Sequence, residues 1–156
     1  MNALDTELAR RHGIEPGWTF GKAFDVRWGE LDAFGHVNNR SYISWCEDAR
    51  NAYFGELGEY PFTIDGPGPV LKEVGFTYEK PLDASAQVVM TAKVTWMRNT
   101  SFRMDFAAWS FGLAGRGHSI CVWIQNSTGK TIALPDALRQ AIAQCDNAQD
   151  LRTGST

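Results

Sequence analysis

Cysteine is scarce in this sequence, and no cysteine has the spacing of a metal site or a redox motif. Cys46, Cys121 and Cys145 are the only three in 156 residues, and no C-x-x-C pair occurs. Structural zinc sites and disulfide frameworks need more sulfur ligands at closer spacing. We therefore predict no metal site, and we expect the thiols to be small buried apolar groups in a reducing compartment.

An excess of positive charge is also missing. The chain has 15 Lys and Arg against 18 Asp and Glu, and its longest basic run is Arg10-Arg11. Duplex nucleic-acid binders normally carry a basic face, so nucleic acid is not an expected partner. No apolar run is long enough to cross a bilayer, and residues 1–13 lack the apolar core of a signal peptide. We expect a cytoplasmic protein without a membrane partner.

What the sequence does contain is typical of one globular domain. Hydrophobic residues make up 44% of the chain, and this length can bury a sizeable core. Six Trp and nine Phe predict a well-filled core or an aromatic subunit interface. Residues 1–19 are read as an N-terminal extension with a short helix ended by Gly13, and residues 146–156 as a flexible tail.

The central stretch begins as a strand and enters a polar loop. From Phe20 onward, Phe24, Val26 and Trp28 alternate with charged residues, which indicates a half-buried strand. The following loop, residues 29–37, places a carboxylate and an imidazole just before a helix start, where an anion can be bound.

A long helix is predicted from Asn39 to Leu57, with Asn38 or Asn39 as its cap. Glu47 and Arg50 fall on its polar side and are expected to pair. The apolar stripe is broad, which predicts burial against more than one surface. It comprises Tyr42, Ile43, Trp45, Cys46, Ala49, Tyr53, Phe54 and Leu57.

Four further strands are predicted, over residues 70–79, 86–97, 100–111 and 116–126, followed by a short helix from Pro135. Short connections favour antiparallel hairpins. The residues expected to face the core are Val74, Phe76, Tyr78, Val88, Met90, Ala92, Val94, Trp96, Phe102, Met104, Phe106, Ala108, Ile120, Val122 and Ile124. The chain is thus α+β, and a sheet with one long helix must curl around it. Its exposed edges favour self-association.

The run Asp32-Ala-Phe-Gly35-His36-Val37-Asn38-Asn39, with Tyr42, Trp45 and Glu47–Arg50, resembles the signature of the hotdog-fold acyl-CoA thioesterases, the family of 4-hydroxybenzoyl-CoA thioesterase. Tyr78–Pro81, Asn99–Phe102 and Leu134-Pro135 add support, and the likeness spans residues 20–145. Plant acyl-carrier-protein thioesterases share a similar run, so the acyl carrier remains open.

The resemblance implies a five-stranded antiparallel sheet wrapped around one long helix, with a short C-terminal helix. It implies homodimers or homotetramers with active sites at the dimer interface, no metal or redox cofactor, and hydrolysis of an acyl-CoA to free acid and CoA. The acyl group could be fatty or aromatic.

The same resemblance assigns roles to individual residues. Asp32 would be the general base or the nucleophile, and the backbone N–H of Asn39 would hold the oxyanion. His36 would orient water or bond Asp32, or else bond a loop carbonyl. Asn38 and Tyr42 are candidate substrate contacts, with capping as the alternative for Asn38. The substrate-binding candidates also include Ser101.

Several alternatives remain at this level. One is a non-catalytic acyl-CoA or acyl-carrier-protein binding module, and another is a hotdog dehydratase. Glu47 would be the catalytic acid if the chain followed a different hotdog lineage, but its expected pairing with Arg50 favours a structural role. The acyl pocket could include Trp45, Phe62, Trp96 or Trp109. The cations that could hold CoA phosphates, or remain solvated, are Lys93, Arg98, Arg103 and Arg116.

Overall fold

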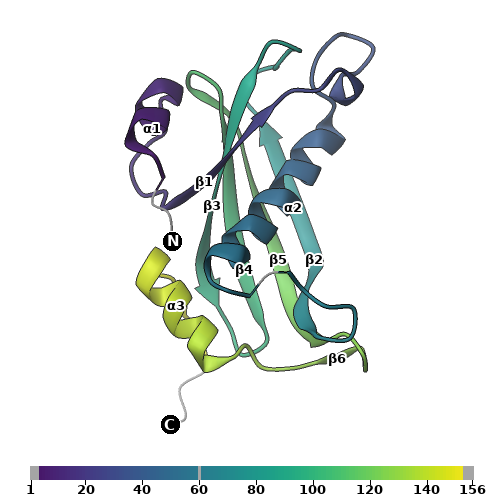
Figure 1. Ribbon diagram of the computed structural model, residues 1–156, viewed down its shortest axis with the longest axis vertical. Coiled ribbons are helices and arrows are strands. Elements are labelled where there is room, and N and C mark those ends of the chain that lie inside the picture. The colour runs from purple at the N-terminus through teal and green to yellow at the C-terminus, as the bar shows by residue number, and fades with distance from the viewer. Residues whose placement is uncertain (1–3, 60, 153–156) are drawn as a thin grey trace.

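The computed structural model describes residues 4–59 and 61–152, and its central feature is a curled sheet with one long helix across it (Figure 1). The sheet order is β1-β3-β4-β5-β2, with all four pairings antiparallel, as predicted. The elements are α1 (Thr6–His12), β1 (Phe20–Asp25), η1 (Trp28–Glu30, a 3-10 turn), α2 (Asn39–Glu56), β2 (Pro67–Tyr78), β3 (Gln87–Met97), β4 (Ser101–Trp109), β5 (Leu113–Gln125), β6 (Lys130–Thr131), α3 (Asp136–Asp146) and β7 (Gln149–Asp150). Among the described residues, no helix is long and apolar enough to cross a membrane.

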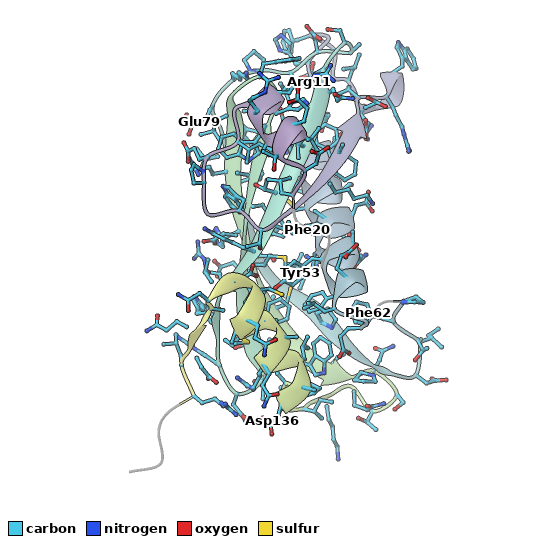
Figure 2. All side chains as sticks on the ribbon, turned by 60° about the vertical axis from the view of Figure 1, so that its left-hand side comes forward. Arg11, Phe20, Tyr53, Phe62, Glu79 and Asp136 are labelled. Atoms are coloured by element: carbon cyan, nitrogen blue, oxygen red, sulfur yellow. The ribbon has the colours of Figure 1, made fainter. Side chains whose placement is uncertain are left out.

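Helix α2 forms the centre of the core. Asn38 caps it through Oδ1, which accepts the Arg40 N–H at 3.1 Å. Most of the predicted stripe is buried against the concave face of the sheet, with Ala49, Tyr53 and Phe54 fully covered, whereas Ile43 and Leu57 are half-buried. Figure 2 shows Tyr53 beside Phe20 of β1, and their rings meet edge-on at 5.8 Å. Each large side chain buried in this way contributes about 1.5–3 kcal/mol.

The inward face of β5 was predicted in the wrong phase. Ser119, Cys121 and Trp123 are the fully buried residues, whereas Ile120, Val122 and Ile124 lie on the opposite face and are half-buried. Residues 120–124 are apolar at every position, so alternation cannot show which set faces the helix. The core therefore takes the indole of Trp123 against Phe54, at 6.0 Å between ring centroids.

Two tryptophans also differ from their predicted positions. A β-bulge between Val94 and Trp96 shifts the register of β3, so that Met97 enters the core in place of Trp96. Trp96 instead lies under the guanidinium of Arg98, 5.0 Å from the ring centroid. Trp28 does not continue β1, because the chain turns into η1, where its side chain is 87% exposed.

Arg50 does not pair with Glu47 on a polar helix face. It is only 8% exposed, and no ion pair between described residues includes it. The reason is positional, since Arg50 is four residues after Cys46 and shares its buried side of α2. Burial raises the pKa of the Cys46 thiol to about 12, and the charge of Arg50 only partly opposes this.

The N-terminal extension covers part of the other face of the sheet. The expected short helix is present as α1 and ends at Gly13, whose φ of 67° is left-handed. Leu8, with residues before and after α1, packs against a second apolar cluster made by Val89, Ala107 and Trp109. The part of the outer face formed by Val89, Ala107 and Trp109 is thereby shielded from water.

The expected tail is structured from residue 146 to 150. Asp146 closes α3, and its carboxylate accepts hydrogen bonds from Thr19 Oγ1 (2.5 Å), Tyr53 Oη (2.6 Å) and the Val94 N–H (2.7 Å). Beyond it, β7 pairs in parallel with the end of β3. A single side chain therefore ties α3 to α2, β3 and the segment before β1.

Replacing Asp146 with Ala is expected to lower the free energy of unfolding by about 2–5 kcal/mol. The change leaves the Tyr53 hydroxyl and the Val94 N–H without an acceptor, and each orphaned buried group costs about 1–3 kcal/mol. Urea denaturation followed by circular dichroism measures the loss. Asp136→Ala on the same helix is the matched control, because that side chain is 83% exposed and should cost less than about 1 kcal/mol. Equal losses in both variants would contradict the prediction.

Candidate active site

The loop before α2 is shaped by the carboxylate of Asp32. Oδ1 accepts the N–H groups of Phe34 (2.8 Å) and His36 (3.1 Å), and the Asp32 N–H donates to the His36 carbonyl at 2.7 Å. Gly35 closes the turn with a φ of 75°, a conformation that favours glycine. Within the described chain, no hydrogen bond reaches Asp32 Oδ2. One carboxylate oxygen holds the loop, and the other is available for chemistry.

Glu30 fixes this loop to the helix. Its carbonyl accepts the Asn38 N–H at 2.7 Å, and its Oε1 accepts the Trp45 indole N–H at 3.0 Å. The far side of the loop is held by the Val37 N–H, which donates to the Leu82 carbonyl at 2.7 Å. The role of Glu30 in holding the loop was not predicted from the sequence. The position of this carboxylate, two residues before Asp32, was the available signal.

The N-terminus of α2 leaves one backbone donor unused. Asn38 accepts the Arg40 N–H through its side chain and the Ser41 N–H through its carbonyl, at 3.1 and 2.9 Å. The Asn39 N–H makes no hydrogen bond within residues 4–59 and 61–152. The positive end of the helix dipole adds to this donor. An oxyanion could therefore be bound at the first residue of the helix.

A pocket of about 420 Å³ brings the predicted residues together. It is lined by Asp32, His36, Val37, Asn38, Asn39 and Tyr42 from the loop and helix, and by Tyr78, Glu79, Lys80 and Pro81 from the end of β2. In the sequence, residues 78–81 only supported the family resemblance and were not predicted to line the site. Lys80 is held by its Nζ, which donates to the Ser110 carbonyl at 2.6 Å.

Ser101 is not part of this pocket within one chain. It begins β4 opposite Val122, on the outer face of the sheet. Its neighbour Phe102 packs against Phe54, in the last turns of α2, at 5.4 Å between ring centroids. Ser101 therefore lies at the far end of α2 from Asn39.

One side chain of the pocket and one beside it have a shifted pKa. Burial raises the pKa of Tyr42 to about 12, and Tyr78, whose ring lies 5.0 Å away, adds to the effect. The Tyr42 hydroxyl is therefore protonated near neutral pH, so it can donate a hydrogen bond but is not a base. Beside the pocket, hydrogen bonds from Ser85 lower the pKa of Asp83, and the nearby His36 contributes in the same direction. His36 itself is exposed.

The other residues considered from sequence lie elsewhere. Lys93, Arg103 and Arg116 line a hollow on the outer face of the sheet, and Arg98 lies at the far end of β3. Of the aromatic candidates for an acyl pocket, Trp45 is near the loop through its bond to Glu30.

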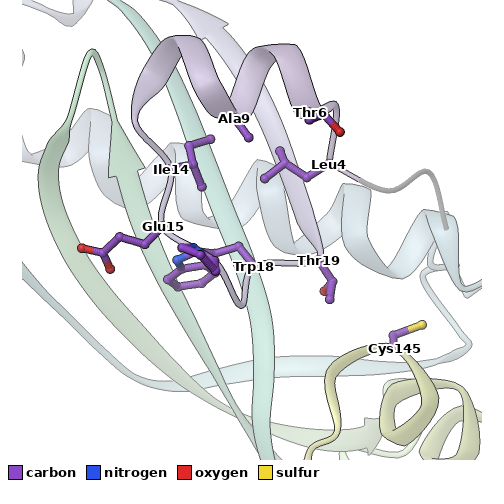
Figure 3. A pocket seen from close by; sticks show the side chains of 9 residues that line it. Leu4, Thr6, Ala9, Ile14, Glu15, Trp18, Thr19 and Cys145 are labelled. Atoms are coloured by element: carbon purple, nitrogen blue, oxygen red, sulfur yellow. The ribbon is translucent and has the colours of Figure 1, made fainter.

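A further hollow of about 510 Å³ lies under α1, between residues 14–19 and Cys145 (Figure 3). No group of three or more metal-ligating side chains occurs in the described part of the chain.

An antiparallel sheet curled around one long helix, with a carboxylate loop at the helix start, defines a hotdog-fold protein of the thioesterase class. The family model of the thioesterase-like superfamily matches residues 26–142, and the chain belongs to this superfamily.

Solved structures agree with this assignment. A thioesterase superfamily protein from Jannaschia sp. CCS1 is 32% identical, covers 97% of both chains and superposes with a TM-score of 0.84. A putative thioesterase from Pseudomonas aeruginosa is 32% identical over 80% of this chain and 98% of its own, with a TM-score of 0.72. A thioesterase from Thermus thermophilus, crystallised with coenzyme A and Zn, is 26% identical over 85% of this chain and 98% of its own, with a TM-score of 0.75.

One curated relative is longer than this protein. It is a chloroplastic acyl-acyl carrier protein thioesterase from Arabidopsis thaliana, 26% identical over 121 residues. The match covers 73% of this chain and 62% of the relative, so this chain spans less than two thirds of that protein.

Proposed function

We propose that this protein is an acyl-CoA thioesterase that hydrolyses fatty or aromatic acyl-CoA to the free acid and CoA. The observation that carries the proposal is the pairing, in one pocket, of a carboxylate oxygen on Asp32 and an unused backbone donor at Asn39. Thioester hydrolysis needs both a base or nucleophile and a donor for the carbonyl oxygen. The structural relative solved with coenzyme A supports CoA as the carrier.

In the general-base route, Asp32 takes a proton from water as the water oxygen bonds to the thioester carbon. Negative charge develops on the carbonyl oxygen and is held by the Asn39 N–H at the helix start. Collapse of the tetrahedral intermediate breaks the C–S bond, and the CoA thiolate leaves and takes up a proton. In the nucleophilic route, Asp32 bonds to the acyl carbon first, and water then hydrolyses the mixed anhydride. Both routes use the same two groups.

Thiol release from a panel of acyl- and aroyl-CoAs tests this function. The wild-type protein should release CoA from at least one member, and Asp32→Ala should not. Equal rates in both proteins, or no turnover with any substrate, would reject a hydrolase. Saturable binding without turnover, unchanged in Asp32→Ala, would instead identify a non-catalytic acyl-CoA binding module. The Arabidopsis relative makes acyl-carrier protein the second substrate to include.

We also propose that two copies associate through β2. This strand ends the sheet, and Leu71, Val74 and Tyr78 on it are 38–46% exposed. Leu71 and Val74 lie opposite the fully buried Cys121 and Ser119, so they share the face that α2 covers elsewhere. An open edge with apolar side chains is a typical pairing surface. A homodimer covers it, and a homotetramer would be a pair of such dimers.

Val74→Asp is expected to convert this dimer to a monomer, because pairing would bury two carboxylates without partners. Light scattering coupled to size-exclusion chromatography should give twice the chain mass for the wild type and one chain mass for the variant. Ile64→Asp is the control, since Ile64 is 82% exposed but lies before the strand. A wild-type monomer, or a dimer that survives Val74→Asp, would contradict the proposed interface.

A further inference from the structure

Trp28 is an exposed aromatic residue beside the candidate active site. Its side chain is 87% exposed in the single turn η1, and its ring packs on no other ring among the described residues. Leaving an indole in water forgoes the stabilisation that its burial would give. Tryptophan is a frequent anchor of binding surfaces, because its large ring supplies much contact area.

Two arginines belong to the same short stretch of surface as Trp28. Arg27 directly precedes it, and Arg40 reaches back from the first turn of α2, where its Nη2 donates to the Gly29 carbonyl at 3.2 Å. Both arginines are exposed, and neither belongs to an ion pair between described residues. Of the two acids nearest in sequence, Glu30 accepts the Arg27 N–H (2.7 Å) and the Trp45 indole N–H, and Asp25 accepts the Gln87 amide at 3.4 Å. We call Arg27, Trp28 and Arg40 the Trp28 patch.

The Trp28 patch is fixed to the donor end of α2. The Glu30 carbonyl accepts both the Asn38 N–H and, at 3.4 Å, the Ser41 hydroxyl. Arg40 is the residue after Asn39, whose N–H is the candidate oxyanion donor. The Trp28 patch is therefore joined by hydrogen bonds to the helix start that carries the candidate oxyanion donor. Two of the cations considered from sequence, Arg103 and Arg116, are less suitable, because they already pair with Asp105 and Glu15 on the outer face.

We propose that the Trp28 patch binds the nucleotide end of coenzyme A. The adenine ring stacks on Trp28, and the phosphates accept hydrogen bonds from Arg27 and Arg40. Aromatic side chains stack on any base, and guanidinium groups bind phosphate in a bidentate manner. The inference rests on the proposed function and extends it, because it makes the CoA nucleotide a specificity element that acyl-carrier proteins and simple thioesters lack.

The test compares one acyl group on two leaving groups, CoA and N-acetylcysteamine. Trp28→Leu should lower kcat/KM for the CoA ester about 5- to 100-fold, through KM, because one base–aromatic stack is lost. The same variant should hydrolyse the N-acetylcysteamine ester at the wild-type rate. Arg40→Gln should show the same split, and the effect of salt on KM for the CoA ester should weaken in this variant. Arg98→Gln is the matched control, since that exposed cation lies far from Asn39. It should change kcat/KM for neither ester.

A second measurement is independent of turnover. Adenosine 3′,5′-bisphosphate should bind the wild-type protein in isothermal titration calorimetry, and binding should weaken by a similar factor in Trp28→Leu. Equal losses on both esters, or no loss on either, would overturn the proposal and leave the thioesterase function intact. A change in oligomeric state in Trp28→Leu would overturn it in favour of a subunit contact. If the wild type hydrolyses neither ester, the proposed function fails, and the titration alone decides whether the patch binds a nucleotide.

Discussion

Asp32→Asn is expected to lower kcat about 10²- to 10⁴-fold, the usual contribution of a positioned base, with little change in stability. The substitution suits this loop because an amide oxygen can accept the same two N–H groups, from Phe34 and His36, that Asp32 Oδ1 accepts. What is lost is the negative charge and the basicity of the second oxygen. Steady-state kinetics on a hydrolysed acyl-CoA, with a urea melt of each protein, separates the chemical effect from a structural one.

Asp83→Asn is the matched control for Asp32→Asn. Asp83 is another aspartate that shapes its own turn, through hydrogen bonds from the Ser85 N–H and hydroxyl, and it too lies near His36. It does not line the pocket that contains Asp32. Its substitution should change kcat less than about threefold. A comparable loss in both variants would mean that general negative charge near His36, and not Asp32 itself, supports turnover.

Asn39→Pro is expected to lower kcat about 10²- to 10³-fold, which is the typical cost of one lost oxyanion donor. Proline removes the backbone N–H, and it is well tolerated at the first residue of a helix. Asn38 already has the extended conformation that a following proline requires, with φ of −66° and ψ of 143°. The Asn39 N–H supports no hydrogen bond within the described chain, so its removal should not weaken the helix.

Asn39→Ala gives the opposite expectation at the same position. It keeps the N–H and removes only an exposed side chain, so kcat should stay within a few-fold of the wild type. Circular dichroism should show the same helix content for both variants. If Ala costs as much as Pro, the asparagine side chain and not the main chain contacts the substrate. If Pro has no effect on kcat, the oxyanion is held elsewhere.

Hydrophobic periodicity predicted most of the fold, because most helices and strands bury only one of their faces. The three- and four-residue spacing from Tyr42 to Tyr53 located α2, and alternation from Phe102 to Ala108 located β4 with its correct inward face. It failed for β5, where both faces are apolar. It also failed at Trp96, where a bulge moves one residue out of phase, and single-sequence alternation has no signal for a bulge.

Some residues of the candidate site could likewise be predicted from the sequence, and others could not. Asp32, His36, Asn38, Asn39 and Tyr42 were predictable together because they are close in sequence, and local geometry alone brings them into one pocket. The end of β2 joins them only through the sheet, and a residue such as Ser101 cannot be placed without knowing that β4 begins at the opposite end of α2 from Asn39. The buried position of Arg50 depends on how α2 is rotated against the sheet, which a charge pattern does not reveal.

The two oxygens of the Asp32 carboxylate have different roles, and this has an evolutionary consequence. Since one oxygen builds the loop and the other is free, most substitutions at this position would disturb the fold and be removed by selection. Asparagine is the exception, because it keeps the loop while removing the charge, and it is one base change away from either aspartate codon. A gene duplicate of this protein could thus pass in a single mutational step from an enzyme to a folded, silent receptor for the same ligand.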